Sequence, residues 1–208
     1  MIKNIIFDLG NVMVQNPSIE TVNAFFKDKN EAIKFNDYIF KSEFWKLMDL
    51  GQISNLEVAN KIKENLLVDI KNYNEVEMFM MNWFTKCNVN KETMDLGIKL
   101  KEKGYNIYIL SNMAKATFEY FCSKYEFFNI VSGAVVSGYE GVKKPDRRIF
   151  EILINRYSLD PDNCLLIDDD DTNKTIEVAN SFGIKARRVN ANDVNDVKKL
   201  LLENNIEL

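Results

Sequence analysis

The chain has 208 residues, of which 46% are hydrophobic and 28% charged, and its formal net charge is −4. These values are typical of a globular protein with a buried core, and they lack the basic bias of nucleic-acid-binding proteins. The sequence contains no histidine. This excludes Ser-His-Asp and Cys-His hydrolases, histidine zinc sites and phosphohistidine chemistry, so proton transfer near neutral pH must use other side chains.

In chain order, the first apolar run, Ile2 to Phe7, predicts a buried strand that ends at Asp8. The region from there to about residue 90 has helical spacing and few strand signals. Its aromatic residues, Phe44, Trp45, Trp83 and Phe84, are interpreted as packing residues rather than as a substrate cage. Its expected helices are Glu20 to Lys27, Glu31 to Leu50, Asn55 to Leu66 and Val76 to Phe84, with Ser54 or Asn55 as the N-cap of the third.

Strands and helices alternate in the rest of the chain. Apolar runs predict strands at Tyr105 to Leu110, Cys164 to Ile167 and Ile184 to Val189. Helices are expected at Glu92 to Lys103, Pro145 to Tyr157, Thr172 to Phe182 and Val194 to Asn204. The alternation predicts an α/β fold with a doubly wound parallel sheet, and the earlier helical region would lie over the carboxyl ends of its strands as a lid.

The cysteines and the N-terminus favour a cytoplasmic protein. Cys87, Cys122 and Cys164 are far apart and form no CxxC pair, which predicts reduced thiols buried in the core. The first apolar run is too short for a signal sequence and is interrupted by Asp8, and no stretch is long enough to span a bilayer. The expected partner is therefore a small molecule, with no nucleic acid and no membrane, and no oligomeric state is predicted.

Polar side chains follow three of the expected strands. They are Asp8, Ser111 with Asn112, and Asp168 with Asp169. Because the carboxyl ends of parallel strands meet at one edge of a sheet, we expect these side chains to lie close together. Clustered carboxylates favour a hard cation such as Mg²⁺, which leaves coordination positions for water and phosphate. Ser111 and backbone amides could bind phosphate oxygens, and a lysine of the Lys143-Lys144-Pro145 turn could neutralise the phosphate charge.

Four motifs, in order along the chain, resemble those of the haloacid dehalogenase superfamily. They are Ile5 to Val12, Leu110 to Asn112, Gly141 to Asp146, and Leu165 to Asp169 with Asn173 following. Each motif alone has low specificity, but four in this order and spacing are specific, and the resemblance covers essentially the whole chain. It implies a Rossmann-like core of residues 1–16 and 91–208, and a small helical cap domain of residues 17–90 inserted after the first strand.

The resemblance also implies a reaction, namely Mg²⁺-dependent hydrolysis of a small phosphomonoester through an aspartyl-phosphate. Asp8 would be the covalent nucleophile, and Lys144 would contact both the nucleophile and the phosphate. The implied roles of the others are phosphate binding by Ser111 and Asn112, metal binding by Asp8, Asp169 and the backbone carbonyl of Gly10, and support by Asp168 and Asn173. The stretch Asp8 to Val12 is similar to a subgroup that includes phosphatases of sugar phosphates such as alpha-D-glucose 1-phosphate.

Gly10 departs from the family pattern. Most phosphatases of this family carry a second aspartate two residues after the nucleophile, where it protonates the leaving group and then activates water. Loss of such a group costs about 10²–10⁴-fold in rate, so the sequence predicts a preference for good leaving groups. A rate that does not depend on leaving-group pKa would contradict this prediction.

Two other functions stay open at this point. A 2-haloacid dehalogenase would share the aspartate nucleophile and also lack the second aspartate, but the resemblance associates the pair Asp168 and Asp169 with phosphate chemistry. A non-catalytic binding protein with the same fold is supported by Gly10 alone. Asp170 and Asp171 are interpreted as an acidic loop before the next helix.

Overall fold

A five-stranded parallel sheet forms the centre of the fold in the computed structural model, which describes residues 1–170 and 172–208. The strand order is β3-β2-β1-β4-β5, and every neighbouring pair is parallel. The strands are β1 (Asn4–Phe7), β2 (Asn106–Ser111), β3 (Gly133–Val136), β4 (Cys164–Asp168) and β5 (Lys185–Arg188). The predicted α/β class with a parallel sheet is confirmed, and the carboxyl ends of β2, β1 and β4 lie side by side.

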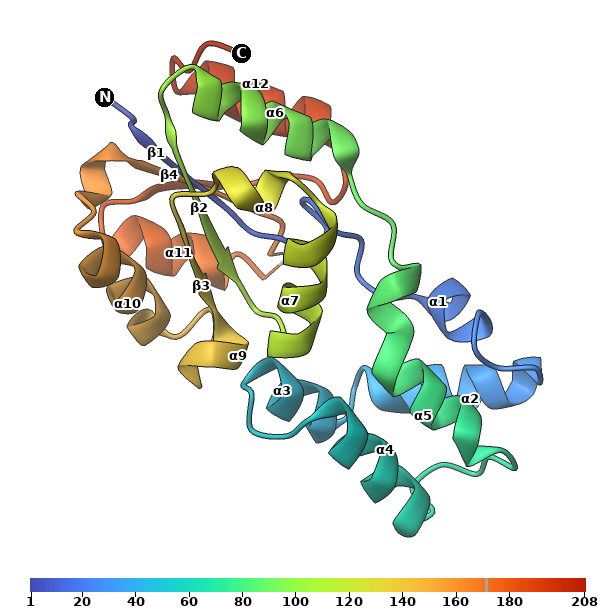
Figure 1. The fold of residues 1–208 in the computed structure, drawn as a ribbon. Coiled ribbons are helices and arrows are strands. Elements are labelled where there is room, and N and C mark those ends of the chain that lie inside the picture. Colours follow the sequence, from blue (N-terminus) through green and yellow to red (C-terminus); the bar gives the residue numbers. More distant parts are fainter. Residues whose placement is uncertain (171) are drawn as a thin grey trace.

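Helices cover both faces of this sheet (Figure 1). Along β1, Ile5 and Phe7 pack in a cluster with α6, α7, α8 and α12, whereas Ile6 packs with α10 and α11. A strand that is buried on both faces in this way needs the continuous apolar run that the sequence shows. The helices are α6 (Lys91–Glu102), α7 (Lys115–Lys124), α8 (Phe127–Ile130), α9 (Ser137–Glu140), the 3-10 helix Pro161–Asn163, α10 (Arg147–Tyr157), α11 (Lys174–Ser181) and α12 (Val194–Glu203).

Between β1 and α6 the chain forms a separate helical block, which comprises α1 to α5 and the 3-10 helix Trp83–Lys86. It has its own hydrophobic cluster, in which the ring centroids of Phe35 and Phe79 are 5.1 Å apart. Figure 1 shows the block beyond one end of the sheet, next to α7 and α9. Its helices are α1 (Ile19–Asn23), α2 (Lys29–Ile39), α3 (Glu43–Asp49), α4 (Asn55–Glu64) and α5 (Tyr73–Asn82). The domain division at residues 16/17 and 90/91 stays a prediction.

Local signals explain where several helices begin and end. Ser54 caps α4 through a capping box with Glu57, as expected, and Gly104 and Gly183 end their helices with positive φ. The expected single helix over residues 31–50 is wrong, because Ser42 accepts a hydrogen bond from the N–H of Trp45 and starts a new helix. Pro145 was expected in the first turn of α10, but it precedes the N-cap Asp146.

The helical block contacts the core closely where α3 ends. Gly51 has φ +66°, and a Cβ there would overlap the carbonyl oxygen of Gly138 in α9. A Cβ on Gly138 would in turn lie 2.6 Å from the backbone nitrogen of Lys115. Only glycine allows three backbone segments to approach this closely. The turn after α3 is therefore held directly against the loop that follows β2.

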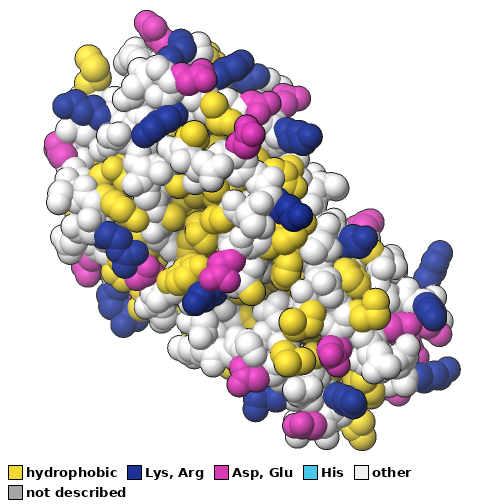
Figure 2. All heavy atoms as spheres, in the orientation of Figure 1, with side chains coloured by type: hydrophobic (Ala, Val, Ile, Leu, Met, Phe, Trp, Pro, Cys, Tyr) yellow, Lys and Arg dark blue, Asp and Glu magenta, His cyan; other side chains and the backbone are white. Residues whose placement is uncertain are grey.

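The face of the molecule shown in Figure 2 carries no continuous basic stripe. Figure 2 shows positive and negative side chains interspersed over both lobes, with hydrophobic side chains between them. Among residues 1–170 and 172–208, no helix is both long and apolar enough to cross a membrane.

Candidate active site

A cavity of about 730 Å³ lies at the carboxyl edge of the sheet, between the core and the helical block. Its floor includes Asp8, Lys144, Asp168 and Asp169, and its upper wall includes aromatic residues of the helical block. Trp45 and Trp83 belong to that wall, so they line the cavity as well as packing in the hydrophobic cluster. The expectation that they serve packing alone was incomplete.

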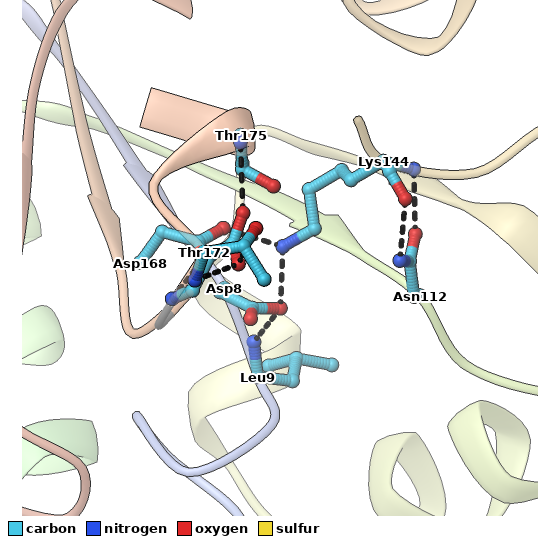
Figure 3. Close-up of polar contacts among 8 residues, drawn as sticks. Asp8, Leu9, Asn112, Lys144, Asp168, Thr172 and Thr175 are labelled. Atoms are coloured by element: carbon cyan, nitrogen blue, oxygen red, sulfur yellow. Dashed lines mark hydrogen bonds and ion pairs between the residues drawn. The ribbon is translucent and has the colours of Figure 1, made fainter. Parts of the chain in front are cut away.

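Asp8 follows the buried strand β1 and is itself only 8% exposed. Its backbone N–H donates to the carbonyl of Ile167 in β4 at 2.9 Å, which continues the sheet pairing beyond the strand. Its Oδ1 accepts a hydrogen bond from the N–H of Leu9 at 2.7 Å and lies 2.9 Å from Nζ of Lys144 (Figure 3). The carboxylate is therefore fixed with one oxygen held by two donors.

Lys144 is 5% exposed and links the two central strands of the site. Its Nζ contacts Asp168 Oδ2 at 2.6 Å as well as Asp8. Burial disfavours its charged form, but the charges of Asp168 and Asp8 outweigh burial and raise the pKa of Lys144. Lys144 is therefore a fixed positive charge at the floor of the cavity.

The side chain of Asn112 is hydrogen-bonded to the backbone of Lys144. It is therefore not available to bind a ligand. Its Nδ2 donates to the carbonyl oxygen of Lys144 at 3.0 Å, and its Oδ1 accepts from the backbone N–H of Lys144 at 2.8 Å (Figure 3). Both polar atoms of the amide are thus used. The phosphate-binding role expected of Asn112 would have to come from its backbone N–H.

Ser111 is the last residue of β2 and is 1% exposed. Its hydroxyl has no hydrogen-bond partner within residues 1–170 and 172–208. A buried hydroxyl without a partner costs free energy. An oxygen-bearing ligand at the end of β2 would supply the missing partner.

Three carboxylates meet at this floor. Asp8, Asp168 and Asp169 each offer an oxygen, and these oxygens lie within 4.8 Å of one another. Burial raises the pKa of Asp8 to about 6, Lys144 opposes this shift, and the charge of Asp168 adds to it. Burial likewise raises the pKa of Asp169. One ammonium facing three carboxylates leaves an excess of negative charge, and oxygen ligands of this kind fit Mg²⁺.

The neighbouring loop decides which carboxylates are free to bind a cation. Asp168 already uses both oxygens, since Oδ2 contacts Lys144 and Oδ1 accepts from the N–H of Asp170 at 2.9 Å. Asp170 accepts hydrogen bonds from Thr172 and, at 2.8 Å, from the N–H of Thr175, and these bonds outweigh burial and lower its pKa to about 2. Asp170 therefore fixes the shape of the loop through its hydrogen bonds, whereas we expected it to be only a solvated loop residue. Asp171 lies outside the described residues.

Two further expected site residues, Gly10 and Asn173, differ in their position relative to the cavity. Gly10 lines the cavity, and a Cβ there would lie 3.0 Å from Oδ1 of Asn16, so a side chain at residue 10 would be in tight contact with the Asn16 amide. Asn173 is exposed, has φ +59° at the N-cap of α11, and does not line the cavity. Of the expected residues, the cavity is lined by Asp8, Gly10, Asn112, Lys144, Asp168 and Asp169, whereas Asn173 is exposed outside it and Ser111 is buried at the end of β2 without lining it. Asn16, Asp49 and Asp170 also belong to the site and were missed.

Mg²⁺ is expected to stabilise the protein through this cluster. At about 100 times its Kd, a ligand that binds only the folded state adds about 2.7 kcal/mol, which raises the Tm of a chain of this size by roughly 5–10 °C. Asp169→Asn should abolish most of this shift, whereas the exposed Asp37→Asn in α2 should preserve it. Differential scanning fluorimetry with and without Mg²⁺ measures both, and an equal shift in the Asp169→Asn variant would contradict the assignment.

Fold and site together define an α/β protein with a Rossmann-like core and an acidic site at the ends of its strands. A family model described as haloacid dehalogenase-like hydrolase matches residues 2–180. The chain belongs to this family, as its four motifs indicated.

Relatives and solved structures agree with this assignment. The D-ribitol-5-phosphate phosphatase of Bacteroides thetaiotaomicron is 26% identical over 193 residues, which cover 89% of this chain and 90% of that protein. The fold is similar to that of a haloacid dehalogenase family enzyme from the same organism, in complex with magnesium and inorganic phosphate (TM-score 0.74, 22% identity, 93% and 96% coverage). L-2-haloacid dehalogenase from Xanthobacter autotrophicus is a more distant fold neighbour (TM-score 0.63, 14% identity, 100% and 85% coverage).

Proposed function

We propose that the protein is a Mg²⁺-dependent phosphatase that hydrolyses a small phosphomonoester through an aspartyl-phosphate on Asp8. The observation that carries this proposal is the buried cluster of Asp8, Lys144, Asp168 and Asp169 at the floor of the cavity. An aspartate nucleophile needs a substrate whose charge is compensated. Lys144 and a bound cation would supply that compensation.

Each residue of the floor has a distinct task in this reaction. The Asp8 carboxylate attacks phosphorus, and its orientation is fixed by the Leu9 N–H and by Lys144. Asp8, Asp169 and the backbone carbonyl of Gly10 would hold Mg²⁺, which when bound neutralises charge on the phosphate oxygens. The Ser111 hydroxyl and the Asn112 N–H bind phosphate oxygens. Asp168 fixes Lys144 through the 2.6 Å contact.

The helical block acts as a cap that selects the substrate. Its contribution to the cavity wall is Phe40, Trp45, Asp49 and Trp83. Aromatic side chains beside a single carboxylate suit a neutral polyhydroxyl group rather than a second phosphate. Polyol and sugar phosphates are therefore the first candidate substrates, in keeping with the D-ribitol-5-phosphate phosphatase that the chain is similar to. The three free cysteines are consistent with the cytoplasm as the site of this reaction.

Phosphate release from p-nitrophenyl phosphate tests this proposal. We expect turnover with Mg²⁺ and a loss of more than about 10²-fold with EDTA, because the metal contributes several kcal/mol to transition-state stabilisation. A panel containing D-ribitol 5-phosphate and hexose phosphates then identifies the substrate class.

A 2-haloacid is the discriminating control for the same preparation. Chloride release from 2-chloropropionate that EDTA does not change, without phosphatase activity, would replace this proposal by a dehalogenase. Absence of both activities would favour a non-catalytic binding protein.

A further inference from the structure

The proposed phosphatase reaction needs a proton-transfer group that the β1 loop does not provide. Gly10 has no side chain, and the group nearest to the position of its missing Cβ is the amide of Asn16, which does not titrate. Histidine is absent from the chain. Lys144 is held as a cation by two carboxylates. A proton donor for the leaving group must therefore come from another wall of the cavity.

Asp49 is a carboxylate on that opposite wall. It is the last residue of α3 in the helical block, and it lines the same cavity as Asp8. Its carboxylate makes no hydrogen bond or ion pair within residues 1–170 and 172–208, although its backbone carbonyl does. The Ser137 hydroxyl donates to that carbonyl and accepts a hydrogen bond from the N–H of Met113 at 3.0 Å.

These backbone contacts fix Asp49 relative to the floor. Met113 follows Ser111 and Asn112 directly, so one hydroxyl ties the end of α3 to the loop that carries the proposed phosphate-binding residues. Two residues further on, Gly51 lies against the carbonyl of Gly138. The backbone of Asp49 is thus anchored to the core, while its carboxylate makes no hydrogen bond or ion pair within the described residues.

The surroundings of Asp49 suit proton transfer near neutral pH. Burial beside the aromatic wall raises the pKa of Asp49 to about 7, and the charge of Lys143, from the loop before α10, opposes this shift. The cavity also contains the charged groups of the floor and Lys174 of α11 at its other side. A carboxyl group with such a pKa can both give and take a proton in one catalytic cycle.

We propose that Asp49 is the catalytic acid and base of this site, in place of the aspartate that Gly10 lacks; the proposal rests on the proposed phosphatase function. In the first step, Asp8 forms a bond to phosphorus, the ester P–O bond breaks, and the Asp49 carboxyl gives its proton to the leaving oxygen. In the second step, the Asp49 carboxylate takes a proton from water, which attacks phosphorus and releases phosphate and the Asp8 carboxylate.

A series of phenyl phosphates with ring substituents tests this role, because these substrates differ in leaving-group pKa and carry no hydroxyl groups for Asp49 to bind. Single-turnover rates should fall about 10²–10⁴-fold in Asp49→Asn for phenyl phosphate, and by less than about threefold for p-nitrophenyl phosphate. In the wild type, the rate with phenyl phosphate should decline as pH rises through about 7. That decline should be absent in Asp49→Asn, and Asp49→Glu should restore part of the rate.

Glu43→Gln is the matched control, since Glu43 lies in the same helix, outside the cavity, with its side chain 70% exposed. It should leave both rates unchanged. Equal losses for all leaving groups in Asp49→Asn, or no loss, with an unchanged Tm and an active wild type, would overturn the role of Asp49 alone. An inactive wild type would overturn the proposed phosphatase function and this role with it.

Discussion

Asp8→Asn is expected to reduce kcat for p-nitrophenyl phosphate by more than about 10⁴-fold, as removal of a covalent nucleophile does in other hydrolases. Asparagine has the same shape and keeps an oxygen that can accept the Leu9 N–H, which donates to Asp8 at 2.7 Å. It cannot attack phosphorus, because the amide is not an anion. The loss should therefore appear in kcat with an intact fold, as measured by initial rates and by Tm.

Covalent labelling provides an independent measurement of the same event. Acid quenching of the wild type during turnover should trap a phosphoryl group on the peptide that contains Asp8, and Asp8→Asn should trap none. A variant that keeps activity within about tenfold of the wild type would show that water attacks the substrate directly. The exposed Asp37→Asn, outside the site, serves as the control for handling and folding.

Lys144→Met is expected to cause the largest loss of stability, about 3–5 kcal/mol at pH 8 without metal. Lys144 is 4% exposed at its side chain and pairs with Asp8 and Asp168, so its removal leaves two buried carboxylates without their cation. Breaking a buried ion pair by removing one partner has an effect of this size. Urea denaturation followed by circular dichroism measures it.

The pH dependence of this loss has a definite sign. The pKa of Asp8 is already raised to about 6 in the folded protein, and removal of Lys144 takes away the charge that lowers it. A raised folded-state pKa means that stability is present below the unfolded value of about 3.9 and is lost as pH rises through the folded value. The difference between variant and wild type should therefore be small near pH 4 and large above pH 7.

Two comparisons separate this effect from a general packing defect. Lys143→Met makes the same change one residue earlier, at a half-buried side chain without an ion pair in the described residues, and should cost less than about 1 kcal/mol. Asp8→Asn combined with Lys144→Met should recover part of the loss, because one unpaired charge is removed. Equal effects of the two lysine substitutions would contradict the central position of Lys144.

The sequence predicted those parts of the fold that depend on local patterns. Apolar runs located β1, β2, β4 and β5, and glycine stops located the ends of two helices. The strand β3 was missed because its apolar run, Ala134 to Val136, is only three residues long and is flanked by Gly133 and Ser137. It is stabilised by a long-range contact instead, in which the Tyr157 hydroxyl donates to and accepts from the backbone of Ala134.

The site shows the same difference between features that follow from local sequence patterns and features that depend on long-range contacts. Asp8, Lys144 and Asp169 follow strands or precede a proline in motifs that are readable along the chain, and the structure brings them together. The use of the Asn112 amide as a clamp on Lys144 depends on two loops that are 32 residues apart. Asp49 was missed because nothing in its local sequence shows that Ser137 fixes it over the cavity.

The anchoring of α3 has a consequence for timing. The Ser137 hydroxyl and the contact between Gly51 and Gly138 fasten the backbone at Asp49 and two residues after it to the core. Any movement that opens the helical block enough to separate these contacts also carries the Asp49 carboxyl away from the phosphorus. On the proposed role of Asp49, proton transfer then requires the closed block, so a phosphorylated Asp8 exposed in an open state would persist until the block closes again.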